Sequence, residues 1–129
     1  MFSFRKPLAL MCVSLALLGS ASASAAQVYG EQLEGFSYPY PLHHFSFASQ
    51  QQQLSMGYMD VPAEKSANGQ TVVLLHGKNF CGATWDSTIK ALSQQGYRVI
   101  APDQIGFCSS TKPANYQYTF PPLAQNTHE

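Results

Sequence analysis

The sequence of 129 residues has little charge of either sign. Only 11% of its residues are charged, and seven lysines and arginines balance seven aspartates and glutamates. A chain with so few charges does not have the composition of a disordered tail, and its 12% of aromatic residues favours a packed core. Because the net charge is zero, electrostatics gives no reason to expect nucleic acid or an anionic membrane surface as a partner.

The sequence also lacks the patterns of metal and phosphate sites. It has three cysteines, and neither Cys81 nor Cys108 has a paired ligand nearby at the spacing of a zinc site. No glycine-rich phosphate-binding loop occurs. We therefore expect no metal and no cofactor.

No apolar run reaches the roughly 20 residues of a membrane-spanning helix. Arg5 and Lys6 precede an apolar run from Pro7 to Leu18, and small residues follow as far as Ala26. A basic start, a short apolar stretch and an Ala-x-Ala site predict a secretory signal peptide over residues 1–26, the alternative being an uncleaved anchor. The cleaved protein would be secreted or periplasmic, would not span a membrane, and could hold a disulfide.

Residues 27–49 are predicted to form an extended lead-in and a first strand. The X-Pro steps of Tyr38-Pro39-Tyr40-Pro41 resist helix, and apolar residues alternate in part from His43 onward. The polar tract Gln50–Gln53 is read as a solvated strand edge or a hairpin connection. Alternation over residues 54–59 then predicts a second strand.

Residues 71–101 have the pattern of a strand, a helix and a second strand. The apolar run Thr71–Leu75 is typical of a strand buried on both faces, as in a parallel sheet. A helix is predicted from its N-cap Thr84 to Gln95, with Gly96 as the glycine that ends it. The run Tyr97–Ala101 is the second strand, and the whole is a βαβ unit.

A last helix is predicted to begin at Thr119, with Pro121 and Pro122 in its first turn. One complete and one partial helix cannot cover both faces of such a sheet, so an apolar edge and face should remain exposed. We therefore expect these residues to be the front part of a larger domain that continues past Glu129.

The order of motifs from Gln70 to Glu129 resembles the opening of the α/β-hydrolase fold family, of the AB hydrolase-1 type. A strand ends in His76-Gly77, and the run Gly96–Asp103 reads GYRVIAPD. The residues that match in order are Trp85, Leu92, Gly96, Tyr97, Arg98, Asp103, Gly106, Ser110, Lys112 and Pro113. The fold class implied is α/β: a leading hairpin and a βαβ unit, forming the N-terminal portion of a hydrolase domain over residues 50–129.

The resemblance implies an exported enzyme that cleaves an ester, epoxide or carbon–halogen bond of a small molecule. A serine or aspartate nucleophile would form a covalent intermediate without a cofactor. The elbow that carries a serine nucleophile on this fold is written G-x-S-x-G, with an acid and a histidine later in the chain. The nearest match is Gly106–Ser110, but no buried strand leads directly into it and Lys112-Pro113 follows in place of a helix. We expect no catalytic residue in these 129 residues and no turnover by this chain alone.

The resemblance also assigns roles to the loop after the first βαβ strand. The backbone N–H of Lys78 would be one donor to a developing oxyanion, and Asn79 either adds a contact or is a plain turn residue. His76 and Gly77 would shape the loop, and Phe80 would line the pocket.

The same resemblance places Asp103 and two cysteines at the rim of one cleft. Asp103 would hold the following loop by hydrogen bonds in preference to acting as the catalytic acid. Cys108 stands where the family usually has glycine, and Cys81 lies in the oxyanion loop. We predict a Cys81–Cys108 disulfide; the alternative is two reduced cysteines that act as small hydrophobes.

A second interpretation comes from a different class of protein. The chain could be a naturally short, non-catalytic periplasmic α/β protein that dimerises or binds a partner through its open sheet edge. A third is a frameshifted product that is degraded. A helix that stops without a cap at Glu129 favours the first interpretation, an N-terminal fragment of a hydrolase.

Overall fold

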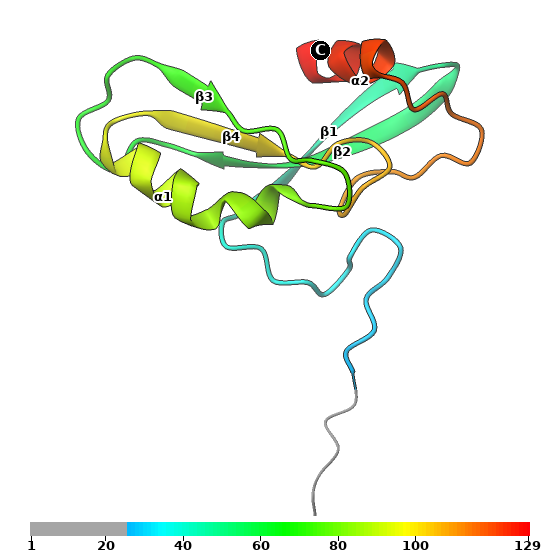
Figure 1. The fold of residues 1–129 in the computed structure, drawn as a ribbon, viewed down its shortest axis with the longest axis horizontal. Helices are drawn as coiled ribbons and strands as arrows, with labels where there is room; N and C mark the ends of the chain where they lie inside the picture. Colours follow the sequence, from blue (N-terminus) through cyan, green and yellow to red (C-terminus); the bar gives the residue numbers. More distant parts are fainter. Residues whose placement is uncertain (1–25) are drawn as a thin grey trace, which may run out of the picture.

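The fold is a four-stranded mixed sheet with one helix on each face (Figure 1). The computed structural model describes residues 26–129, so the predicted signal peptide lies outside the described residues apart from Ala26. Within that range, no helix has the length and apolar character needed to cross a membrane. The elements in chain order are β1 (Leu42–Ser49), β2 (Gln52–Val61), β3 (Thr71–Val73), η1 (Gly82–Trp85), α1 (Asp86–Gln94), β4 (Arg98–Pro102) and α2 (Phe120–His128).

Strands β1 and β2 form an antiparallel hairpin, in which Leu42 lies opposite Met59 and Ser49 opposite Gln52. The turn residues Gln50 and Gln51 have φ angles of 48° and 61°. Two consecutive positive φ angles are the geometry of a type I′ turn, whose twist matches that of the flanking strands. The predicted hairpin is therefore confirmed, with the polar tract as its connection.

Strands β3 and β4 are parallel, with α1 between them in the chain, which confirms the predicted βαβ unit. Gly96 follows α1 with φ 90°, the conformation that a helix-ending glycine adopts. The prediction of Thr84 as N-cap is wrong. Thr84 lies inside the 3₁₀ turn η1, where its hydroxyl donates to the carbonyl oxygen of Cys81 at 2.7 Å. The α-helix itself begins later than predicted, at Asp86, because residues 82–85 form the 3₁₀ turn that precedes it.

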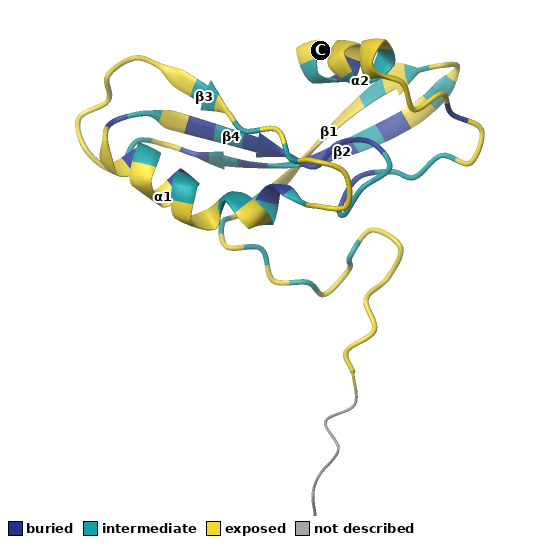
Figure 2. Ribbon diagram, in the orientation of Figure 1, coloured by how far each residue is buried: buried dark blue, intermediate teal, exposed yellow. Residues whose placement is uncertain are grey.

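Strand β2 carries the core on both faces of the sheet, because side chains alternate along a strand. Met59 and Val61 belong to the cluster that contains Ile89 of α1, and Leu54 and Met56 belong to the cluster against which Leu123 of α2 packs. Figure 2 shows the buried parts of β2 and β4 in dark blue. The cluster on the α1 side consists of Met59, Val61, Ile89, Val99 and Ala101. The cluster on the α2 side consists of Leu54, Met56, Ile105 and Tyr116, with Leu123 of α2 packed against it.

Strand β3 is the last strand in the order β1-β2-β4-β3, so its outer edge has no partner strand among residues 26–129. Val73 is 50% exposed and Leu75 is 51% exposed. The sequence predicted a strand buried on both faces from Thr71 to Leu75. That prediction is wrong, because β3 ends at Val73 and none of residues 26–129 covers the face on which Val73 and Leu75 lie. The expected exposed apolar edge is confirmed.

We predict that a positive charge on this edge lowers self-association. Lysine is a residue with which natural edge strands avoid pairing with other chains, so Val73→Lys should shift the protein toward monomer. Sedimentation velocity over a dilution series measures the change. Thr71→Lys is the matched control, since it adds the same charge to the same strand without removing apolar surface. A Val73→Lys variant that associates as strongly as the unmodified chain would contradict the prediction, and an equal fall in both variants would show that charge alone accounts for the effect.

Candidate active-site loops at the carboxyl ends of β3 and β4

The carboxylate of Asp103, directly after β4, joins three separate segments of the chain. The residue is 1% exposed. Its Oδ1 accepts the backbone N–H of Gly82 at 2.7 Å. Its Oδ2 accepts the backbone N–H and the hydroxyl of Ser109, at 3.0 and 2.6 Å, and the hydroxyl of Tyr38. A buried carboxylate is stable only when donors surround it, and hydrogen bonds to a charged group are the strong ones. Asp103 thus lies where the predicted loop-holding role requires it.

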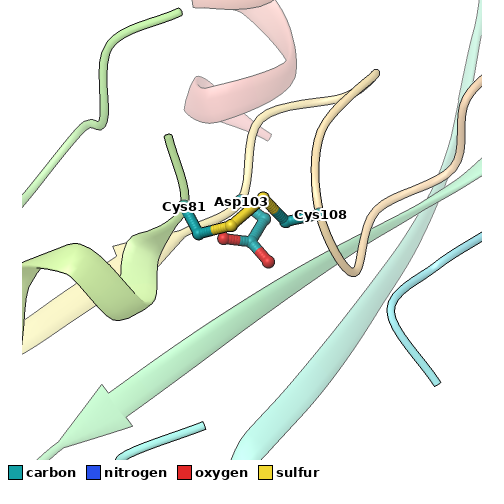
Figure 3. A group of neighbouring side chains, drawn as sticks. All are labelled: Cys81, Asp103 and Cys108. Atoms are coloured by element: carbon teal, nitrogen blue, oxygen red, sulfur yellow. A yellow bond between two sulfur atoms is a disulfide. The ribbon is translucent and has the colours of Figure 1, made fainter. Parts of the chain in front are cut away.

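Cys81 and Cys108 form a disulfide beside this carboxylate (Figure 3). Their Cα atoms are 5.9 Å apart, within the range that a disulfide spans without backbone movement. The disulfide links the same two loops that Asp103 joins through Gly82 and Ser109. The two cysteines and Asp103 are close enough together to hold a metal ion, but the sulfur atoms are bonded to each other and offer no thiolate.

His76 lies between two backbone groups. Its Nε2 accepts the backbone N–H of Gln104 at 2.9 Å, which requires the proton to be on Nδ1, and Nδ1 donates to the carbonyl oxygen of Gly77 at 2.9 Å. The ring also lies edge-on to Phe107, with centroids 5.4 Å apart. Because both ring nitrogens are hydrogen-bonded to backbone groups, His76 links the strand end to Gln104 and Gly77.

Lys78 and Asn79 are the two central residues of a tight turn. The N–H of Phe80 donates to the carbonyl oxygen of Gly77 at 3.1 Å, and Asn79 has φ 68° while Lys78 has no positive φ. This combination identifies a type II turn. The hydrogen bond that closes the turn uses the N–H of Phe80 and leaves that of Lys78 outside it. The turn lies on the surface, and the Phe80 side chain is 56% exposed. Among the described residues, Phe80 therefore does not line a closed pocket.

Three links anchor this turn, and all of them end on the segment 103–108. His76 binds Gln104 on the side before the turn. On the side after it, Cys81 is bonded to Cys108 and Gly82 to Asp103. A loop anchored on both sides loses its conformational freedom before any ligand arrives, which is what preorganisation of a hydrogen-bond donor requires.

The loop that receives these links is itself fixed to β2. The N–H of Asp103 donates to the carbonyl oxygen of Gly57 at 2.8 Å, and the N–H of Gly57 donates to the hydroxyl of Ser110 at 2.9 Å. A Cβ on Gly57 would lie 1.9 Å from the hydroxyl oxygen of Ser109, so only glycine permits this approach. Lys112 donates to the carbonyl oxygen of Cys108 at 2.6 Å, and burial lowers the pKa of its ammonium group.

The structure brings together the predicted residues His76 to Phe80, Cys81, Asp103 and Cys108. Sequence reasoning missed Tyr38, Gly82 and Ser109 as partners of Asp103, because no local pattern marks them. His43 and His128 lie outside the cluster, on β1 and α2.

A groove of about 300 Å³ lies apart from the turn, between the α2 face of the sheet and α2. Its lining includes Phe45, Met56, Tyr58, Ile100 and Asn126.

Comparisons with known proteins agree with this geometry. A family model described as "alpha/beta hydrolase fold" matches residues 70–126. A haloalkane dehalogenase of Mycobacterium marinum is 40% identical over 85 residues, which are 63% of this chain and 28% of that protein. A pimeloyl-[acyl-carrier protein] methyl ester esterase of Aeromonas hydrophila is 37% identical over 67 residues, covering 52% of this chain and 26% of that protein.

Among solved structures, a protein of Pseudomonas aeruginosa PAO1 described as a probable hydrolytic enzyme is 61% identical, with a TM-score of 0.77. The match covers 80% of this chain and 33% of that one. The chain therefore spans between a quarter and a third of the length of these similar proteins.

We predict that loss of the disulfide destabilises the fold. The cysteines are 27 residues apart, and closing a loop of that length contributes about 3–4 kcal/mol to the free energy of unfolding. Urea unfolding without reductant should show a loss of that order for Cys81→Ser and for Cys108→Ser.

Cys108 has φ 47°, which costs a non-glycine residue about 1–2 kcal/mol. Cys108→Gly should therefore be more stable than Cys108→Ser by about 1 kcal/mol; equal stabilities would argue against that cost.

We also predict that Asp103→Asn lowers the free energy of unfolding by about 3 kcal/mol. An amide has only one acceptor oxygen and turns its NH₂ group toward donors. Asp60→Asn is the control. Asp60 pairs with Arg98 at 2.5 Å on the surface, a setting in which ion pairs contribute little. Arg98 lowers the pKa of Asp60, so this pair is intact at neutral pH and its contribution is lost only as the pH falls through that lowered pKa. Equal losses in the two variants at pH 7 would count against the central place of Asp103.

Proposed function

Because the chain belongs to the α/β-hydrolase fold family, we propose that it supplies the oxyanion side of the active site of an exported α/β-hydrolase. The enzyme would cleave an ester, epoxide or carbon–halogen bond of a small molecule through a covalent intermediate on a serine or aspartate, without a cofactor. The activities named for the similar proteins include dehalogenation and methyl ester hydrolysis, and they belong to those proteins.

The observation that carries this proposal is the anchored turn at the carboxyl end of β3. In acyl transfer a nucleophile adds to a carbonyl carbon, and the electron pair of the C=O bond moves to oxygen. A backbone N–H that already points at the position of that oxygen stabilises the developing charge without reorganisation. We propose the N–H of Lys78 as that donor, because the hydrogen bond of its turn does not use it and three links fix the turn.

The nucleophile, the acid and the catalytic histidine are proposed to come from the remainder of the domain. The 129 residues contain no G-x-S-x-G motif. The exposed outer edge of β3 is where a further strand of such a domain could pair, and Val73 and Leu75 are apolar there. Export also remains part of the proposal: the disulfide suits an oxidising compartment, and the signal peptide is inferred from sequence.

A chimera with the P. aeruginosa protein tests the role of the turn. Residues 27–129 would replace the matching part of that protein, and hydrolysis would be measured on a panel of aryl esters, epoxides and haloalkanes that the unmodified protein is first shown to cleave. Lys78→Pro deletes the N–H in question together with the lysine side chain, and proline is favoured at this position of a type II turn. We expect kcat to fall by about 10²–10³-fold with little change in KM.

Lys78→Ala is the matched control, because it removes the side chain and keeps the N–H; it should retain most of the activity. A Lys78→Pro chimera that folds and keeps its kcat would refute the oxyanion role. The 129-residue chain by itself should neither turn over substrate nor react with a fluorophosphonate serine probe, and labelling of that chain would contradict the proposed division of residues.

A further inference from the structure

We propose that Tyr38, in the segment before the sheet, is a positioning residue of the oxyanion turn and acts through Asp103. The inference rests on the proposed function of that turn. The segment before β1 would then help to shape the site, whereas its Tyr- and Pro-rich sequence predicts only an extended conformation.

The lead-in is docked against the α1 side of the sheet. The Tyr38 ring packs against the core cluster of Met59, Val99 and Ala101, and its hydroxyl donates to Oδ2 of Asp103, 65 residues away in sequence. Figure 1 shows this segment in blue and cyan, passing below the sheet on the side of α1. The ring of Phe36 lies edge-on to Tyr38, with centroids 5.1 Å apart. These contacts place the hydroxyl at the carboxylate.

Tyr38 is the one donor to Asp103 that the two active-site loops do not supply themselves. Gly82 and Ser109 supply the other three hydrogen bonds. Asp103 is 1% exposed, so water cannot readily replace a lost donor at its Oδ2. Burial, and then the hydrogen bond to Asp103, raise the pKa of the Tyr38 phenol, which therefore keeps its proton and remains a donor at physiological pH. The contact is a fixed positioning element in that range of pH.

The path from the carboxylate to the turn is short and has little freedom. Gly82, whose N–H is bound by Oδ1, follows Cys81, and only Phe80 and Cys81 separate it from the two central residues of the turn. A Cβ on Gly82 would lie 2.8 Å from the carbonyl oxygen of Ala101, so the backbone here is already in close contact with β4. A carboxylate that turns in its site would therefore displace Gly82, and with it the residues just before it.

Amide hydrogen exchange by NMR on the whole 129-residue chain tests this proposal. Tyr38→Phe removes one oxygen atom and keeps the ring and its packing. We expect the amides of Gly82 and Ser109 to exchange about tenfold faster in this variant, with shifted resonances at Lys78 and Phe80. The amide of Ile89, in the core of α1, should keep its rate.

Tyr29→Phe is the matched control, since it removes a hydroxyl from an exposed tyrosine in the same segment and should change none of these rates. Equal acceleration at Gly82, Ser109 and Ile89 would show that Tyr38 only stabilises the fold, and unchanged rates at Gly82 and Ser109 would show that its hydroxyl positions nothing. Either result overturns the proposal. Exchange is measured without any reaction, so a failure here is distinct from a failure of the oxyanion role, which the Lys78→Pro chimera reports.

Discussion

A single buried carboxylate organises this end of the molecule. The carboxyl group of Asp103 is buried, and donors from Gly82, Ser109 and Tyr38 surround it, because a buried polar group without partners is costly. Meeting this requirement brings together the segment before the sheet, the start of η1 and the loop after β4. The Cys81–Cys108 disulfide links two of the same segments by a covalent bond. The turn at residues 77–80 is thus held by this disulfide, by the hydrogen bond from Gly82 to Asp103 and by the hydrogen bond from Gln104 to His76.

Strand β2 of the sheet holds the loop after β4 in place. Strand β2 has a core cluster on each face, and its middle residue Gly57 accepts the backbone N–H of Asp103 and donates to the hydroxyl of Ser110. The carboxyl end of β4 is therefore tied to the best-packed strand of the described chain. This arrangement explains why a short turn of exposed residues can keep a defined shape. The residues beside the turn are bonded to the loop after β4, and that loop is hydrogen-bonded to the backbone of β2.

Stabilising an oxyanion is one part of hydrolysis, and it is the part that we propose for this stretch of chain. A preorganised N–H lowers the energy of charge that develops on oxygen, but a nucleophile must first form the bond that creates that charge. The proposed division leaves Lys78 and its anchors here and the nucleophile elsewhere in the domain. The exposed edge of β3, with Val73 and Leu75, accords with a sheet that continues there. No residue of the turn lines the groove beside α2.

Local patterns were enough to predict the hairpin, the βαβ unit and the helix-ending glycine, because periodicity and glycine conformation act over a few residues. The order of motifs after Gln70 was enough to identify the family, and with it the pairing of Cys81 with Cys108. The start of the helix was misjudged, since Thr84 lies inside a 3₁₀ turn whose first residue, Gly82, is bound to Asp103 across 21 residues, a contact that local sequence does not show. The exposure of β3 depends on what lies beside it, which its own residues do not encode. The role of Tyr38 was decided only by the tertiary structure, because a hydrogen bond across 65 residues leaves no trace in local sequence.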